Sequence, residues 1–185
     1  MMKHTIRGMA AAICGVILAA GAADAQPSLS FGTGVGATMP VGDLGDTYNL
    51  GWNAQANLGV TSPTWPIALR FDVQYHSLSG EDNSGVGAED LRILAGIANA
   101  ELYVARSNGG GFFVVGGAGI YNADAEGDVG DSSTDFGVLF GGGYKLAMTN
   151  LLLSLEGKFH NVFTDVIDTQ FVPVNIVVEI PFGGR

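Results

Sequence analysis

Cysteine is nearly absent from this chain of 185 residues, in which Cys14 is the single example. Cys14 lies among the first 25 residues, which have the pattern of a removable leader. The rest of the chain therefore cannot form a disulfide. Its stability must come from packing, hydrogen bonding or a membrane rather than from covalent cross-links.

The leader has the three parts of a secretory signal. Basic residues at the start are followed by an apolar run from residue 9 to about residue 22, and then by Ala23-Asp24-Ala25. Such an arrangement is typical of a signal peptide, and the run is too short and too rich in alanine and glycine to span a membrane comfortably. We expect residues 1–25 to be a signal peptide and residues 26–185 to form one exported domain.

Positive charge is also scarce. The chain has 8 Lys and Arg against 18 Asp and Glu, a net charge of −10, and Lys145 and Lys158 are the lysines that follow the leader. A negatively charged, exported protein is poorly suited to nucleic acid, so we expect no nucleic-acid partner. Most of the acidic residues lie in polar connecting stretches, whereas the outer strand faces of a soluble all-β domain normally carry many Lys and Glu.

Helical periodicity is missing beyond the leader. Eight segments show period-two alternation or short β-rich runs instead, which predicts strands. Each is slightly longer than the roughly 9–11 residues that a tilted transmembrane strand needs. The segments are residues 28–39, 51–61, 66–78, 91–104, 111–122, 135–147, 150–163 and 170–182.

The connections between these segments alternate in character. Four are acidic, and three of those are long; the three between them are shorter and carry no acid. In an up-and-down sheet, successive turns lie at opposite ends, so the acidic connections share one end and the short turns share the other with both termini. Short periplasmic turns, longer external loops and an even strand number are typical of an outer-membrane barrel. The acidic connections are residues 40–50, 79–90, 123–134 and 164–169, and the shorter ones are 62–65, 105–110 and 148–149.

Each strand segment has two unlike faces. In residues 67–77, IALRFDVQYHS, every second residue from Ile67 is apolar or aromatic, while Arg70, Asp72, Gln74 and His76 lie between them. Alternate side chains point to opposite faces of a strand. The polar faces are rich in glycine, which suits the narrow lumen of an eight-stranded barrel if glycines lie opposite the bulky polar side chains.

The apolar faces are expected to contact lipid, with aromatic residues at the two membrane interfaces. The residues expected to face lipid are Leu69, Phe71, Val73, Leu153, Leu155, Val174, Ile176 and Val178. The expected interface aromatics are Trp52, Tyr75, Tyr144 and Phe182.

The charged residues of the polar faces are expected to pair inside the lumen, because a buried unpaired charge costs several kcal/mol. Adjacent strands predict one cluster at Arg70, Asp72, Asn99 and Glu101, and a second at Lys145, Glu156, Lys158 and Glu179. The two signs are expected to offset one another, so that the clusters plug the barrel. The alternative is a gate or narrow channel for small solutes.

Two further alternatives are a soluble lipocalin-like carrier with its apolar face inward and a lipid-modifying enzyme. An enzyme would need a nucleophile and a base within hydrogen-bond reach. The best candidates are His76 with Ser77 or Ser79, and His160, but Ser77 lies on the opposite face from His76. We expect no catalytic residues, cofactor or metal site.

The last predicted strand, QFVPVNIVVEIPF (170–182), has apolar residues at every second position and ends in an aromatic residue. With GGGYKL (141–146) and LEGKFHNVF (155–163), it resembles the small eight-stranded outer-membrane proteins. These include the transmembrane domain of outer membrane protein A, outer membrane protein X and the opacity proteins. The chain departs from this family in Gly183-Gly184-Arg185, which follow the closing aromatic residue.

The resemblance implies an all-β, eight-stranded antiparallel up-and-down transmembrane barrel in the outer membrane of a Gram-negative-type bacterium, with both termini periplasmic. It implies a structural or surface-interaction role, with outer-membrane lipid, lipopolysaccharide and the barrel-assembly machinery as partners. The acidic connections suggest weak binding of divalent cations.

Overall fold

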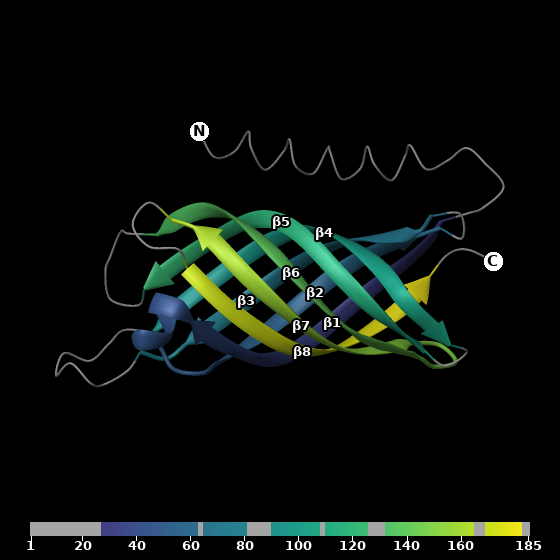
Figure 1. Ribbon diagram of the computed structural model, residues 1–185, viewed down its shortest axis with the longest axis horizontal. Helices are drawn as coiled ribbons and strands as arrows, with labels where there is room; N and C mark the ends of the chain where they lie inside the picture. The colour runs from purple at the N-terminus through teal and green to yellow at the C-terminus, as the bar shows by residue number, and fades with distance from the viewer. Residues whose placement is uncertain are drawn as a thin grey trace.

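The computed structural model describes residues 27–62, 65–80, 90–107, 110–125, 132–164 and 169–182, so the expected signal peptide lies outside the described residues. Eight strands run diagonally along the wall of an elongated barrel (Figure 1). They are β1 (Ser28–Val41), β2 (Gly51–Thr61), β3 (Ile67–Leu78), β4 (Leu91–Ser107), β5 (Gly110–Ala125), β6 (Ser133–Ala147), β7 (Leu152–Phe163) and β8 (Thr169–Phe182).

The sheet closes on itself. Each strand pairs with the next in antiparallel fashion, and β8 pairs with β1 over Leu29–Val41. Closure provides hydrogen-bond partners for β1 and β8, the first and last strands, which would otherwise have free edges. The predicted closed, eight-stranded up-and-down barrel is therefore confirmed, and every strand boundary lies within three residues of the predicted one.

One connection differs from the irregular loop that the sequence predicts. The link between β1 and β2 contains a short 3-10 helix, η1 (Gly42–Asp46), which begins at a glycine with a φ of 60°. Leu44 and Tyr48 from this link pack against the buried hydrophobic cluster of the barrel. In Figure 1, η1 lies at the left end of the barrel, and β8 ends at the right end. No helix among the described residues is long and apolar enough to cross a membrane.

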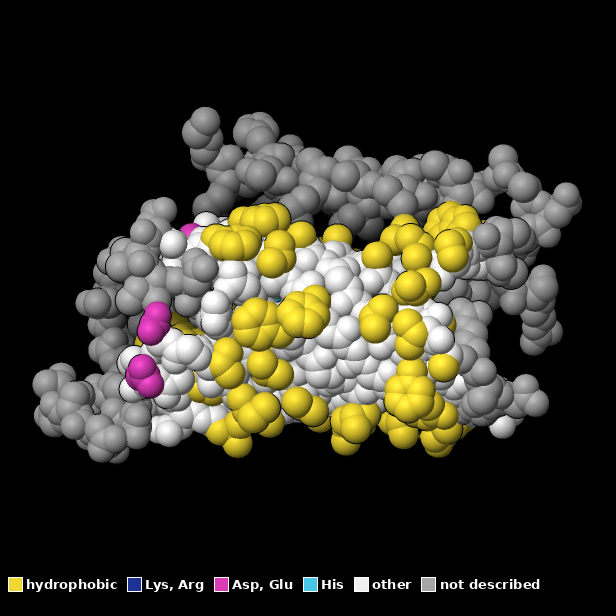
Figure 2. Space-filling view, viewed as in Figure 1, with side chains coloured by type: hydrophobic (Ala, Val, Ile, Leu, Met, Phe, Trp, Pro, Cys, Tyr) yellow, Lys and Arg dark blue, Asp and Glu magenta, His cyan; other side chains and the backbone are white. Residues whose placement is uncertain are grey.

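The polarity of the barrel is inverted relative to a soluble protein. Large apolar side chains are exposed around the outer wall, as at Val35, Phe140 and Ile176, whereas charged and amide side chains are buried. Figure 2 shows hydrophobic side chains spread along the wall, with acidic side chains at the end that carries η1. The lumen is therefore the polar side of the sheet.

Glycines make room for the charged side chains. In the strand register, Gly59 pairs with Arg70, Gly32 with Glu179, Gly141 with Lys158, and Gly143 with Glu156. A Cβ atom on Gly32 would lie 2.7 Å from Cγ of Glu179, and one on Gly141 would lie 2.7 Å from Cα of Lys158. The expectation that glycines lie opposite bulky charged residues is confirmed at these four positions, where no larger residue fits without displacing a neighbour.

Candidate functional site: the barrel lumen

Four charged side chains from β3 and β7 form a closed ring across the lumen, which we call the first ring. Arg70 Nε lies 2.9 Å from Asp72 Oδ1, and Arg70 Nη1 lies 2.9 Å from Glu156 Oε2. Lys158 Nζ completes the ring at 3.0 Å from Asp72 Oδ2 and 2.8 Å from Glu156 Oε1. Positive and negative side chains alternate around the ring, so every charge has two neighbours of the opposite sign.

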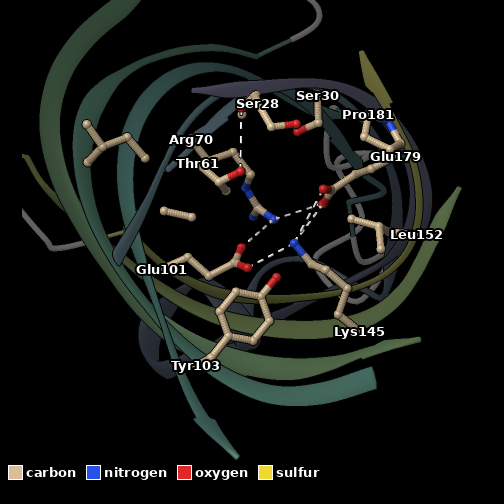
Figure 3. Close-up of a pocket in the computed structure, with 13 residues that line it drawn as sticks. Ser28, Ser30, Thr61, Arg70, Glu101, Tyr103, Lys145, Leu152, Glu179 and Pro181 are labelled. Carbon is tan, nitrogen blue, oxygen red and sulfur yellow. Dashed lines mark hydrogen bonds and ion pairs between the residues drawn. The ribbon is translucent and has the colours of Figure 1, made fainter. Parts of the chain in front are cut away.

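A second ring shares Arg70 and lies nearer the chain termini. Arg70 Nη1 is 3.5 Å from Glu101 Oε2 and 3.8 Å from Glu179 Oε1. Lys145 Nζ lies 2.9 Å from Glu101 Oε1 and 3.1 Å from Glu179 Oε1. Figure 3 shows these side chains pointing toward one another from different strands of the wall. Arg70 therefore joins two rings that together involve five strands.

This grouping corrects the predicted one. The sequence placed Glu156 and Lys158 with Lys145 and Glu179, because it compared adjacent strands. In the structure β3 and β7 meet across the narrow lumen, so Glu156 and Lys158 join Arg70 and Asp72. All the charged side chains of the rings are at most 5% exposed.

The expected balance of signs is also wrong. The rings contain three cations and four carboxylates. Two amides stabilise the excess negative charge: Gln55 Nε2 donates to Glu156 Oε1 over 2.7 Å, and Gln74 Nε2 donates to Asp72 Oδ2 over 3.3 Å. The sequence analysis placed Gln74 on the polar face of its strand but included neither glutamine in the network.

These amides belong to a directional hydrogen-bond chain. Because the oxygen of Gln74 can only accept, the His76 Nε2 that lies 3.2 Å from it must donate. Thr38 Oγ1 accepts from Asn53 Nδ2 and lies 2.9 Å from His76 Nδ1, so its own proton is available for that nitrogen. These partners fit a neutral His76 with its proton on Nε2. Donors then point from Asn53 toward the carboxylates.

Aromatic packing closes the lumen nearer the long connections. We call His76, Tyr121, His160 and Phe171 the loop-side cap. His160 stacks on Phe171, with ring centroids 4.7 Å apart and an interplanar angle of 20°, and His76 meets the same ring edge-on at 4.9 Å. Tyr121 Oη lies 2.9 Å from His160 Nδ1. The four side chains are at most 1% exposed, and apolar residues such as Ile93 and Leu139 are also buried in this part of the barrel.

Asn99 differs from its predicted role. It lies opposite Arg70 in the register and is buried, but neither of its amide atoms has a hydrogen-bond partner among the described residues. A Cβ on Gly117 would lie 2.1 Å from Asn99 Oδ1, so the amide occupies the space beside that glycine.

The loop-side cap was not predicted from the sequence, because Tyr121 and Phe171 are aromatic residues on a face that was expected to be polar.

In the described part of the chain, the structure shows no hydrogen bond between His76 and either of its predicted partners, Ser77 and Ser79. His76 bonds to Thr38 and Gln74, while Ser77 lies on the outward face of β3. His160 bonds to a phenol rather than to an aliphatic hydroxyl. No group of three or more metal-ligating side chains occurs among the described residues.

A cavity opens at the end where β1 begins and β8 ends, and we call it the vestibule. Its empty volume is about 400 Å³, including space open to solvent. Ser28, Ser30, Thr61 and Tyr103 line it together with the second ring (Figure 3). The second ring therefore faces accessible space on one side, whereas the other members of the first ring, Asp72, Glu156 and Lys158, do not line this cavity.

The residues expected to face lipid all occupy outward positions of their strands, where they are half-buried or exposed. The predicted interface aromatics lie at the two ends of the wall. Trp52 and Tyr75 have ring centroids 5.5 Å apart near the loop end, and Tyr144 lies 4.8 Å from Phe112 near the other end, where Phe182 also closes β8. Their placement agrees with two aromatic belts, although contact with lipid remains a prediction.

Comparison with known proteins places this fold among outer-membrane barrels. No protein-family model matches the chain, and no curated protein matches its sequence. Neisserial surface protein A shares 14% identity with a TM-score of 0.65, over 83% of this chain and 97% of that structure. The N-terminal β-barrel domain of Pseudomonas aeruginosa OprF shares 10% identity with a TM-score of 0.56, over 86% and 100%. The attachment invasion locus protein Ail of Yersinia pestis, solved with the heparin analogue sucrose octasulfate, shares 11% identity with a TM-score of 0.53, over 86% and 100%. These likenesses show a shared barrel fold.

Proposed function

We propose that this chain is an exported outer-membrane barrel with a structural or surface-interaction role, and that it acts without catalysis. The observation that carries the proposal is the inverted polarity of the wall. Exposed side chains such as Phe140 and Ile176 would be unfavourable in water, whereas a bilayer solvates them. Because the sheet is closed, its backbone groups are paired within the barrel, as a spanning structure requires.

The proposed orientation follows from the two ends. The termini and the shorter turns would face the periplasm, and η1 with the acidic connections would face outward, as in barrels of this architecture. The described acids at that end include Asp43, Asp46, Asp90, Asp124 and Asp135, while those at 81–89, 126–131 and 165–168 lie outside the described residues. We propose that this acidic end of the barrel contacts lipopolysaccharide, and that weakly bound divalent cations bridge the lipopolysaccharide phosphates to it. The final strand would present the signal for the assembly machinery.

The lumen supports a closed barrel better than a channel for small solutes. The two rings and the loop-side cap fill successive levels of the lumen with buried side chains. An eight-stranded barrel is only wide enough for its own side chains to fill. A surface-interaction role would then depend on the external connections, since loops commonly carry such functions.

Fractionation with heat-modifiable electrophoresis tests the proposal. The full chain is expressed in a Gram-negative host, and membrane fractions are run with and without boiling. We expect the protein in the outer-membrane fraction, with a change in migration on boiling because the closed barrel resists detergent at room temperature. Recovery in the soluble periplasmic fraction would favour the lipocalin-like carrier and contradict the proposal. A known outer-membrane barrel and a known periplasmic protein serve as controls.

A further inference from the structure

Two side-chain amides pair on the outer wall between β7 and β8. Val162 and Phe171 point into the lumen, so their chain neighbours Asn161 and Gln170 point outward. These two residues are register partners, and Gln170 Nε2 donates to Asn161 Oδ1 over 2.8 Å; we call them the amide pair. Among the described residues, Asn161 Nδ2 and Gln170 Oε1 make no hydrogen bond. The pair can therefore offer a donor and an acceptor to another molecule.

Phenylalanines lie on both sides of the amide pair along the strands. In the row nearer the long connections, Phe136 and Phe163 are stacked, with ring centroids 6.3 Å apart and an interplanar angle of 13°. In the row on the other side, the ring centroids of Phe140 and Phe159 are 5.8 Å apart. Asn161 lies between Phe159 and Phe163 on the outward face of β7. The amide groups therefore open onto a surface of aromatic rings.

The amide pair lies at the end of the wall that carries η1. Asn161 is two residues before the end of β7, and Gln170 is the second residue of β8. A Cβ atom on Gly42, the first residue of η1, would lie 3.2 Å from Gln170 Oε1. In the orientation proposed above, this is the level of the headgroups of the outer leaflet. A polar group without a partner costs free energy in hydrocarbon, whereas headgroups supply hydrogen-bond partners at this level.

The charges around the amide pair do not suit a phosphate, which proteins commonly bind through arginine or lysine. β6 and β7 carry Lys145 and Lys158, but both side chains are buried in the lumen, and β1 and β8 contain neither lysine nor arginine. An uncharged donor beside an uncharged acceptor matches a hydroxyl group, which can both accept and donate. The negative face of an aromatic ring also packs well against the C–H groups of a sugar ring.

We propose that the amide pair and these four phenylalanines bind the neutral saccharide headgroup of an outer-leaflet glycolipid. The inference rests on the proposed outer-membrane function and adds to it a ligand class and a binding surface. Sugar hydroxyls bond to Asn161 Nδ2 and Gln170 Oε1, and one face of the sugar packs on the rings of Phe136 and Phe163. The acyl chains continue along the apolar wall toward the middle of the membrane.

Competition between two lipids tests the proposal. The protein is refolded into detergent micelles that contain equal amounts of a diglucosyl diacylglycerol and a phosphatidylglycerol with the same acyl chains. Native mass spectrometry then measures which lipid the barrel retains. We expect about fivefold more glycolipid than phosphatidylglycerol, roughly the contribution of one hydrogen bond of ordinary net strength.

Asn161→Leu should remove this preference, and Gln170→Leu should lower it. Ser77→Leu is the matched control, because Ser77 is an outward-facing polar residue at the loop end of β3, across the barrel, and it should leave the preference unchanged. Heat-modifiable migration checks that each variant is folded.

Equal retention of the two lipids by the unmodified protein would overturn the proposal, as would a preference that Asn161→Leu does not change. A dimer that Asn161→Leu abolishes, with no glycolipid retained, would show that a second copy of the chain covers this surface and would also overturn it. These results leave the proposed outer-membrane location unaffected, because fractionation tests that location separately.

Discussion

The half of the lumen nearest the chain termini holds the two charged rings, whereas the half nearest the long connections holds the loop-side cap of two histidines, Tyr121 and Phe171. In both halves the side chains of the rings and the cap are at most 5% exposed, but they are held by different forces. The rings depend on each charge keeping its opposite neighbours. The cap depends on ring packing and on one phenol–imidazole hydrogen bond.

This difference indicates in which half of the lumen a substitution destabilises the barrel more. A buried ion pair is costly to break because the remaining charge is left without a partner. A substitution in the loop-side cap, where the side chains are neutral, leaves at most a cavity or an unpaired polar atom. Gln74 and His76 connect the two halves through a hydrogen bond of 3.2 Å.

The largest effect is expected from Arg70→Met. This change opens both rings and leaves four carboxylates with two lysines, so it should lower the free energy of unfolding by about 3–5 kcal/mol. The measurement is a urea titration of the refolded barrel in lipid vesicles, followed by tryptophan fluorescence. Arg92→Met is the matched control, because Arg92 is exposed on the outer face of β4, and it should change the value by less than about 0.5 kcal/mol. A similar loss of unfolding free energy in the two variants would contradict the conclusion that the charged rings stabilise the barrel.

A smaller effect is expected in the cap from Tyr121→Phe. The ring packing against Phe171 is kept, but His160 Nδ1 loses its partner at 2.9 Å. A buried polar atom without a partner costs about 1–3 kcal/mol, and the same urea titration measures the loss. Tyr75→Phe on the outward face is the control and should be nearly neutral. A loss as large as that of Arg70→Met would remove the distinction between the halves.

The smallest effect is the coupling between the halves. If each half is held by its own contacts, the double variant Arg70→Met/Tyr121→Phe should lose the sum of the single losses within about 0.5 kcal/mol. The singles and the double are measured in one unfolding series, which forms a double-mutant cycle. A coupling energy well above that limit would show that the Gln74–His76 link joins the halves into one energetic unit.

The fold could be predicted almost completely from the sequence, because side chains alternate strictly along each strand and the connections alternate in length. IALRFDVQYHS alone shows both faces of β3. The general expectation that glycines lie opposite bulky polar side chains holds at Gly59 and Gly143, which pair with Arg70 and Glu156, although these pairs themselves were not predicted. The 3-10 helix at Gly42–Asp46 was missed because five residues give too little periodicity to recognise.

The charged members of the lumen network were predicted, but Gln55 and Gln74 were not included, Asn99 was included although it has no hydrogen-bond partner among the described residues, and the connections were not predicted. Register arguments relate neighbouring strands, such as β3 and β4, but not β3 and β7, which meet only because the barrel closes. The partnership of Arg70 with Glu156 therefore could not be predicted from the sequence. Phe171 and Tyr121 were missed for a related reason: an apolar residue on a lumenal face gives no sign of which ring it will meet across the lumen.

Planar-bilayer recording of the purified, refolded protein tests the central claim, that rings and cap together close the lumen, most directly. An open porin inserted by the same procedure shows that channels are detectable. We predict no steady conductance from the wild-type barrel, because both halves are filled by packed side chains. Steady, resolvable channels from the wild-type protein would contradict the closed lumen and favour a small-solute channel instead.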